Sequence, residues 1–144
     1  RDCLENLVIN LKIPLLGICV GMQILADKSE EGITPGLGWI SGNVRAFSNN
    51  STSSRLPLPH MGWNTLHINK TSLISLENND QLPEFYFLHS YYFDAKDKSI
   101  VSATSGYGFD FDAVISNKNI HGVQFHPEKS HQWGEKLLKN FSTI

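Results

Sequence analysis

Cys19 is the residue whose surroundings most suggest chemistry. It lies between two glycines in the segment PLLGICVGMQIL, residues 14–25, after an apolar run. The spacing G-x-C-x-G is the thiol counterpart of the G-x-S-x-G elbow, in which a nucleophile lies on a strained turn between a strand and a helix. There the helix N-terminus would stabilise a thiolate, and the backbone N–H of Val20 would bind an oxyanion. Taken alone, the short motif favours a buried, inert cysteine instead.

A base and an acid follow 107 residues later, in the segment HGVQFHPEKS. Pro127 favours an extended His126, and in extended chain residues i and i+2 project to the same side. Glu128 is therefore expected to accept the ring N–H of His126 and to hold its tautomer. Separately, His126 is equally well a core or surface histidine, and Glu128 a solvated loop charge. Combined with an elbow cysteine, the pair favours nucleophilic catalysis.

The composition narrows the class of protein. The chain has 144 residues, 40% of them hydrophobic, and a formal net charge of -2, which is typical of one globular domain. We expect no nucleic-acid partner, because there is no basic stripe, and no membrane span, because no apolar run reaches the necessary length. Two cysteines make no disulfide framework, which favours a reduced, cytoplasmic protein. The six histidines show no i, i+4 pair and the chain has no Cys-x-x-Cys, so no metal site is predicted.

Hydrophobic periodicity predicts an α/β fold with an antiparallel portion. Helices are predicted over residues 1–11, 21–31 and 134–144, the second one directly after the elbow. Strands are predicted over residues 15–19, 42–47, 65–68, 84–93, 98–105, 111–117 and 120–125. The chain starts within a helical pattern and without methionine, and a sheet beginning at residue 15 would normally follow another βα unit. We therefore expect residues 1–144 to be a single domain whose N-terminal part is missing.

Two pairs of segments carry a family resemblance that covers nearly the whole chain. GICVGMQIL together with GVQFHPEKS resembles the class I (triad) glutamine amidotransferases. Within them, PHMGWNTL and FYFLHSYYF are similar to the HisH-like branch, the glutaminase subunits of imidazole glycerol phosphate synthase. The resemblance implies a flavodoxin-like mixed sheet with flanking helices. The family also has a glycine-rich oxyanion strand before the elbow, which this chain lacks.

The resemblance assigns roles to the motif residues. Cys19 would attack the side-chain amide of L-glutamine, His126 would protonate the leaving ammonia, and Glu128 would orient His126. It implies a γ-glutamyl thioester intermediate and no cofactor. Substrate contacts would come from Val20 and Gly21 at the elbow, the side chain of Gln23, and the backbone of Ser90 and Tyr91. Without the family, Gln23 would be interpreted as a solvent-facing helix residue.

The resemblance also implies a partner. The loop Met61, Gly62, Trp63 and Asn64 would face a HisF-like (β/α)8 cyclase subunit in a heterodimer, which would receive the ammonia and make imidazole glycerol phosphate and AICAR for histidine biosynthesis. From the residues alone, Trp63 is equally well a core tryptophan. Three alternatives remain open: a paralogue that supplies ammonia for surface-sugar amidination, an inactive binding fragment, and a cysteine hydrolase acting on another amide.

Overall fold

Two strands from opposite ends of the chain pair in parallel at one edge of the main sheet. In the computed structural model, which describes residues 1–71, 73–74 and 82–144, β1 (Leu15–Ile18) pairs with β10 (Ile120–Val123). Ile18 lies opposite Val123, so the residues that follow both strands leave the same end of the sheet. The chain therefore delivers Cys19 and His126 to neighbouring strand ends.

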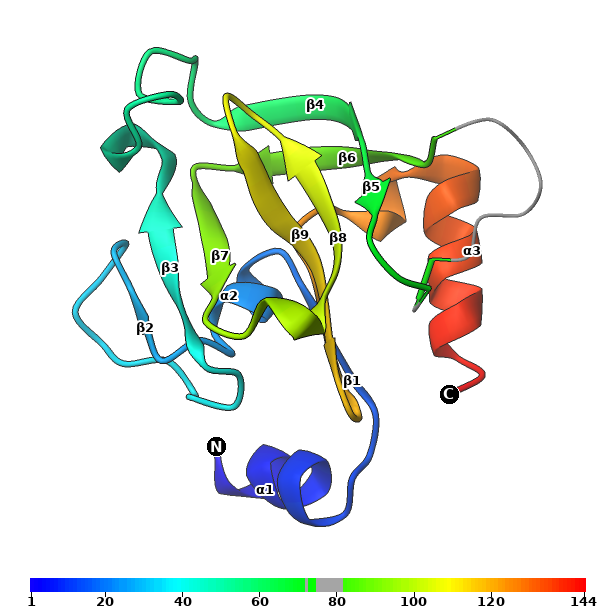
Figure 1. The fold of residues 1–144 in the computed structure, drawn as a ribbon. Coiled ribbons are helices and arrows are strands. Elements are labelled where there is room, and N and C mark those ends of the chain that lie inside the picture. Colours follow the sequence, from blue (N-terminus) through cyan, green and yellow to red (C-terminus); the bar gives the residue numbers. More distant parts are fainter. Residues whose placement is uncertain (72, 75–81) are drawn as a thin grey trace.

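The main sheet continues from this pair by antiparallel neighbours. Its order is β1-β10-β9-β7-β3-β2, and β8 and β5 extend it from β9. A second sheet of two antiparallel strands, β4 and β6, runs across the top of the first (Figure 1). The remaining strand bounds are β2 Lys28–Ser29, β3 Gly42–Ala46, β4 His60–Thr65, β5 His67–Ile68, β6 Glu84–His89, β7 Tyr91–Ala95, β8 Val101–Gly106 and β9 Asp110–Asn117.

The helices are short except the last. The α-helices are α1 (Asp2–Glu5), which continues into a π-helical segment over Asn6–Asn10, α2 (Val20–Gln23) and α3 (His131–Phe141). Single 3₁₀ turns occupy Phe47–Asn49, Lys98–Ile100 and Pro127–Lys129. Figure 1 shows α3 packed beside the sheets and α1 beneath β1. No helix among the described residues is both long and apolar enough to cross a membrane.

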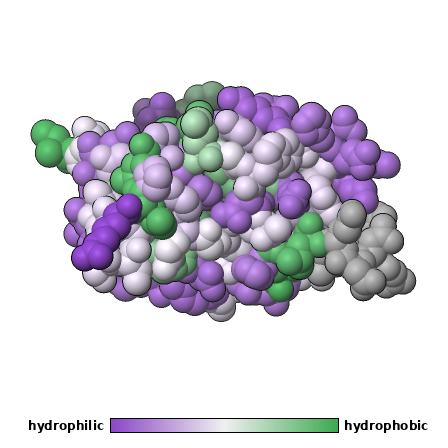
Figure 2. Space-filling model, turned by 90° about the horizontal axis from the view of Figure 1, so that it is seen from above, coloured by the Kyte–Doolittle hydropathy of each residue, from purple (hydrophilic) through white to green (hydrophobic). Residues whose placement is uncertain are grey.

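Two hydrophobic clusters hold the sheets and helices together. One contains Phe85 and Phe87 of β6, Phe111 of β9 and Leu137 of α3, all at most 1% exposed. The other includes Val8 and Met22, and so fixes the N-terminal helical segment and α2 against the main sheet. Burying one such side chain stabilises the fold by about 1.5–3 kcal/mol. The face seen from above is largely hydrophilic, with separate hydrophobic patches (Figure 2).

Most of the predicted elements are confirmed, including the α/β fold class and the strand and helix that flank Cys19. The extent predicted for that helix, residues 21–31, is wrong, because α2 ends at Gln23 and residues 28–29 form β2, paired in parallel with β3. The physical reason is a loop that packs back on the helix end. A Cβ on Gly36 would lie 2.0 Å from the carbonyl oxygen of Ala26, so only glycine permits this approach.

Among the other boundaries that differ from prediction, two depend on distant partner strands. The segment predicted as an exposed loop, Met61 to Asn64, is part of strand β4 and pairs with β6. The strand predicted over residues 65–68 is divided between the end of β4 and the two-residue β5. In both cases partner strands far away in sequence, β6 and β8, decide the pairing.

Candidate functional site

Cys19 lies on a strained turn between β1 and α2. Its backbone has φ 51° and ψ -109°, a left-handed conformation that costs a non-glycine residue about 1–3 kcal/mol. The turn is held by a hydrogen bond from Cys19 N–H to the Val123 carbonyl at 2.8 Å. A Cβ on Gly17 would lie 2.4 Å from the Gly21 carbonyl, whereas one on Gly21 would meet nothing within 4 Å. Of the two motif glycines, therefore, only Gly17 is required by close packing.

The thiol of Cys19 lies in a partly buried, weakly polar environment. Its Sγ is 3.8 Å from the Leu88 carbonyl oxygen, to which it donates, and accepts from Gln124 Nε2 at 3.7 Å. Burial raises the pKa of the Cys19 thiol, and hydrogen bonds from Val20 N–H and Gln124 only partly oppose this. We expected the helix N-terminus to stabilise a thiolate, but α2 is only one turn long. The effect of burial, which favours the neutral thiol, is therefore the larger one. The thiol needs a base to become a nucleophile.

His126 and Glu128 form the pair that their spacing predicts. His126 leaves β10 in extended geometry, φ -103° and ψ 95°, immediately before Pro127. Its Nδ1 lies 2.7 Å from Glu128 Oε1. Because a carboxylate only accepts, the proton lies on Nδ1 and the lone pair of the neutral ring on Nε2. The bond to Glu128 therefore orients His126 so that its Nε2 can accept a proton.

The segment that carries this base is fixed to β6. His126 N–H donates to the Tyr86 carbonyl at 2.8 Å. The Ser130 hydroxyl donates to the His126 carbonyl at 2.6 Å and accepts from Tyr86 N–H at 3.0 Å. One backbone bond and the Ser130 hydroxyl thus hold His126 to β6, while Cys19 is held by β1 and β10. The negative charge of Glu128 acts on Cys19 and contributes to its raised pKa.

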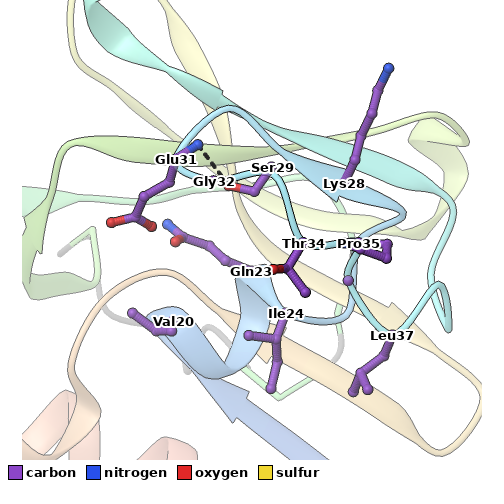
Figure 3. A pocket seen from close by; sticks show the side chains of 11 residues that line it. Val20, Gln23, Ile24, Lys28, Ser29, Glu31, Gly32, Thr34, Pro35 and Leu37 are labelled. Atoms are coloured by element: carbon purple, nitrogen blue, oxygen red, sulfur yellow. Dashed lines mark hydrogen bonds between the residues drawn. The ribbon is translucent and has the colours of Figure 1, made fainter.

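A cavity of about 330 Å³ opens beside Cys19. It brings together residues from segments far apart in the chain: Cys19, Val20, Gln23, Glu31, Pro59, Leu88, His89, Ser90 and Tyr91. Five of the residues predicted for the site line it (Cys19, Val20, Gln23, Ser90 and Tyr91), whereas Gly21, His126 and Glu128 do not. Val20, Gln23 and Glu31 also line a neighbouring cavity of about 450 Å³, where the Glu31 carboxylate lies on the same side as the Gln23 amide (Figure 3).

Glu31 and His89 are cavity residues that the sequence analysis missed. Glu31 fell within the helix predicted over residues 21–31, so its side chain had no assigned place. The chain reversal after α2 carries it back over the elbow. The alternation of β6 was the available signal for His89, because it lies on the same face as the buried Phe85 and Phe87.

Gln23 is an internal residue and not a solvent-facing one. It is 7% exposed, and its Nε2 donates both to the Tyr91 carbonyl at 3.0 Å and to Gln124 Oε1 at 3.0 Å. An amide nitrogen has two hydrogens, so both donors are used. Only the Gln23 oxygen is left for a substrate contact.

The four residues of the predicted partner surface divide between two environments. Met61 and Trp63 project outward and are 64% and 48% exposed, so Trp63 is not a core tryptophan. Trp63 stacks on His131 with ring centroids 5.3 Å apart. Gly62 lies between them with φ 124°. Asn64 turns inward, where its Nδ2 donates to the Gly106 carbonyl at 2.8 Å.

Among the described ranges, 1–71, 73–74 and 82–144, no group of three His, Cys, Asp or Glu residues could hold a metal ion. The candidate site therefore consists of a thiol, an oriented imidazole and a cavity with one carboxylate. Such a set of groups suits acyl transfer from an amide through a covalent intermediate.

Comparisons with a family model and with known sequences point to the same family of proteins. The family model "Glutamine amidotransferase class-I" matches residues 3–143. The chain is 49% identical to the imidazole glycerol phosphate synthase subunit HisH of Leptospira borgpetersenii and 47% identical to that of Bdellovibrio bacteriovorus, covering all of this chain and 70% of each relative. Among solved structures, a glutamine amidotransferase aligns with a TM-score of 0.65 at 16% identity, over 98% of this chain and 67% of that one. A glutamine amidotransferase from Thermotoga maritima aligns with a TM-score of 0.57 at 17% identity, over 98% of this chain and 52% of that one. The two structures support the fold alone.

Proposed function

Because this chain belongs to the class-I glutamine amidotransferase family, we propose that it is a HisH-type subunit that hydrolyses L-glutamine to glutamate and ammonia for histidine biosynthesis in the cytoplasm. One observation carries the proposal. A strained elbow cysteine and a histidine bonded to a glutamate at 2.7 Å leave adjacent parallel strands at the same end of the sheet. This arrangement supports covalent catalysis on a carboxamide.

In the first half-reaction, His126 Nε2 takes the proton from the Cys19 thiol. The Sγ attacks the side-chain carbonyl carbon of glutamine and forms a tetrahedral adduct, whose oxygen carries the negative charge. The Val20 N–H at the elbow is one donor for that oxygen. The adduct collapses when the His126 imidazolium protonates the amide nitrogen, which leaves as ammonia. A γ-glutamyl thioester on Cys19 remains.

In the second half-reaction, neutral His126 takes a proton from water. The resulting hydroxide attacks the thioester carbonyl, the C–S bond breaks, and the proton on His126 returns to the sulfur. Glutamate leaves and the enzyme is restored. Glu128 holds the Nδ1 proton of His126 throughout and stabilises the imidazolium that forms twice in the cycle.

The cavity suits the amino-acid end of glutamine. We assign the α-ammonium group to the Glu31 carboxylate, because Glu31 is the carboxylate that lines the cavity together with Cys19. We assign the α-carboxylate to the turn at Ser90 and Tyr91, which lines the wall between β6 and β7. The charge of Glu31 at one end and the polar backbone of the turn at the other would select glutamine over simple amides.

We infer a HisF-like (β/α)8 cyclase as the partner, seated against Met61 and Trp63. Large, half-exposed apolar side chains on one strand face suit the centre of a protein interface. Ammonia is largely protonated in neutral water and diffuses away, so transfer to a bound partner protects the nucleophilic form. The relatives are named as subunits, which supports an assembly of this kind.

The test is glutamine hydrolysis by the protein with its partner subunit, in the wild type, Cys19→Ala and Cys3→Ala. Cys3 is the other free cysteine and is exposed, which makes Cys3→Ala the matched control. We expect Cys19→Ala to abolish hydrolysis and Cys3→Ala to leave it intact. Undiminished activity in Cys19→Ala would refute the nucleophile assignment.

A further inference from the structure

Two buried histidines beside the cavity form a direct hydrogen bond that the mechanism above does not use. His60 on β4 and His89 at the end of β6 are 4% and 5% exposed. Their rings meet at 2.9 Å, between His60 Nδ1 and His89 Nε2. The two residues are a cross-strand pair in the β4–β6 sheet, so the contact joins the strand that carries Trp63 to the strand that leads into the substrate turn.

The partners of this pair fix the direction of every bond. His89 Nδ1 lies 2.7 Å from the Tyr91 carbonyl oxygen, which can only accept, so His89 carries its proton on Nδ1. In a neutral ring Nε2 is then the acceptor, and His60 must donate to it from Nδ1. His60 Nε2 is left as an acceptor, and Asn64 Nδ2 lies 3.3 Å from it. A chain of hydrogen bonds therefore runs from Asn64 through His60 and His89 to the carbonyl group of Tyr91.

The orientation of the Asn64 amide is fixed independently. Its Nδ2 donates to the Gly106 carbonyl at 2.8 Å, and its Oδ1 accepts from Thr65 N–H at 2.9 Å. The nitrogen of the amide, with its second hydrogen, is consequently the atom that faces His60. Each hydrogen bond from Asn64 to Tyr91 therefore has one donor and one acceptor.

The other end of the chain leads to the nucleophile. The Tyr91 carbonyl also accepts from Gln23 Nε2 at 3.0 Å, and Gln23 donates to Gln124 Oε1. Gln124 Nε2 then donates to Cys19 Sγ at 3.7 Å. Hydrogen bonds thus connect strand β4 to the thiol by way of the carbonyl group of the substrate turn.

Aromatic rings hold both imidazoles in place and keep them neutral. His60 stacks between Tyr107, with centroids 4.2 Å apart, and Phe87, with centroids 5.0 Å apart. Phe47 meets the His89 ring edge-on at 5.2 Å. Burial lowers the pKa of His60 to about 4 and that of His89 to about 3. A protonated His89 would place an N–H on Nε2 against the N–H of His60 and break the chain.

We propose that His60 and His89 are positioning residues for glutamine binding: as neutral Nδ1–H tautomers, they hold the turn at Tyr91 in register with Gln23 and Cys19. The proposal rests on the proposed function, because it concerns the same cavity. It assigns the pair to holding substrate and not to the proton transfers, which belong to His126. Loss of the pair should therefore change KM for glutamine more than it changes the reactivity of the Cys19 thiol.

The variants separate the hydrogen bond from generic burial. His60→Asn keeps a donor at the position of Nδ1, whereas His60→Leu removes it and leaves His89 Nε2 without a partner. His121→Leu is the matched control, because His121 is 6% exposed and bonds Ser116 on the neighbouring strand β9, outside the His60–His89 network. Each variant is measured with the partner subunit for KM and kcat with glutamine, for the alkylation rate of Cys19 by iodoacetamide, and for thermal unfolding.

We expect His60→Leu to raise KM about tenfold, the factor of one lost buried hydrogen bond. Alkylation by iodoacetamide should stay within about twofold of wild type, since this small reagent needs no substrate turn. His60→Asn should recover most of the KM, and His121→Leu should leave KM unchanged. Equal KM changes in His60→Leu and His121→Leu, or a His60→Asn no better than His60→Leu, would overturn the proposal.

A measurement on the wild type decides the geometry without any variant. Long-range ¹H–¹⁵N spectra of the histidine rings at pH 7 should show Nδ1–H tautomers for both His60 and His89. An Nε2–H tautomer at either residue would overturn the chain. A wild type that hydrolyses no glutamine would instead overturn the proposed function, so the two failures are distinguishable.

Discussion

The backbone N–H of Cys19 donates a hydrogen bond to the carbonyl oxygen of Val123 at 2.8 Å. This bond extends the parallel ladder of β1 and β10 by one residue beyond Ile18. It fixes Cys19, the proposed nucleophile, opposite a residue that precedes His126 by only three positions in the chain. The separation of Val123 from His126 is thus set by the bend at Gln124 and Phe125 and by the extended His126 before Pro127.

Glu128→Gln should impair the chemical step more than substrate binding. The carboxylate accepts the His126 Nδ1 proton at 2.7 Å, and a glutamine amide can present an N–H there and favour the wrong tautomer. We expect kcat to fall by about 10²–10⁴ with KM within a few-fold of wild type. Glu5→Gln, at a partly exposed position in α1 where the carboxylate pairs with Arg1, is the control. A loss confined to KM would contradict the role of Glu128.

Glu31→Gln should have the opposite signature. Removing the carboxylate removes the partner proposed for the α-ammonium group of glutamine, while Cys19 and His126 are untouched. We expect KM to rise about 10- to 100-fold with kcat little changed. An amide substrate that lacks the α-amino group should be hydrolysed equally by wild type and variant. If the variant discriminates against that substrate as well, Glu31 has another role.

The two elbow glycines should respond differently to alanine. Gly17→Ala places a Cβ 2.4 Å from the Gly21 carbonyl oxygen, a backbone atom that moves only if the elbow moves. We expect a destabilisation of about 1–3 kcal/mol, typical of overpacking, measured by urea unfolding. Gly21→Ala meets open space and should change stability by less than about 1 kcal/mol in either direction. Equal losses in the two variants would show that the close approach at Gly17 is not what constrains the elbow.

Stability should fall on mild acidification. The pKa values of His60 and His89 in the folded chain, about 4 and about 3, lie below that of an unfolded histidine, near 6.5. Between these limits the unfolded chain binds more protons, so unfolding becomes more favourable as the pH falls. Each histidine contributes a slope of up to about 1.4 kcal/mol per pH unit below pH 6.5.

The measurement for this prediction is urea unfolding at several values between pH 7.5 and 4.5. His60→Asn removes one of the two buried imidazoles and should flatten the dependence in that window. His67→Asn, at an exposed position of β5, should leave the slope as in wild type. A stability that rises as the pH falls from 6.5 would contradict the neutral histidine pair.

Trp63→Ala should weaken assembly without weakening the fold. The side chain is 48% exposed and stacks on His131, so its loss opens no core cavity. We expect the dissociation constant for the proposed cyclase partner to rise at least about 30-fold, the size of an interface hot spot. Titration calorimetry measures this, and Leu11→Ala, at another exposed apolar position, is the control. Unchanged affinity in Trp63→Ala would exclude this face of β4 from the interface.

Local sequence was sufficient to predict the elements that carry the chemistry. The apolar run before Cys19 and the helical pattern after it predicted a strand and a helix at the elbow, and both are present. The pairing of His126 with Glu128 followed from a two-residue spacing and one proline. Such features depend on a few consecutive residues, so the sequence states them directly.

The length of α2 and the place of Glu31 were not predictable in the same way. Residues 24–31 have helical spacing, yet pairing between β2 and β3 ends the helix early. A strand ladder with a segment fifteen residues away outweighs a weak local propensity. The reversal also carries Glu31 to the cavity, which no local pattern indicated.

The sequence by itself determined which side chains stand at the spacings typical of a nucleophile, a base and an orienting acid, and from them it predicted the type of chemistry. Only the tertiary structure decided what surrounds them. The parallel register of β1 with β10, the chain reversal that brings Glu31 to the cavity, and the bond between His60 and His89 all join residues distant in sequence. These contacts are stabilised by burial and strand pairing across the whole fold. Such stabilisation arises only when distant segments of the chain have come together.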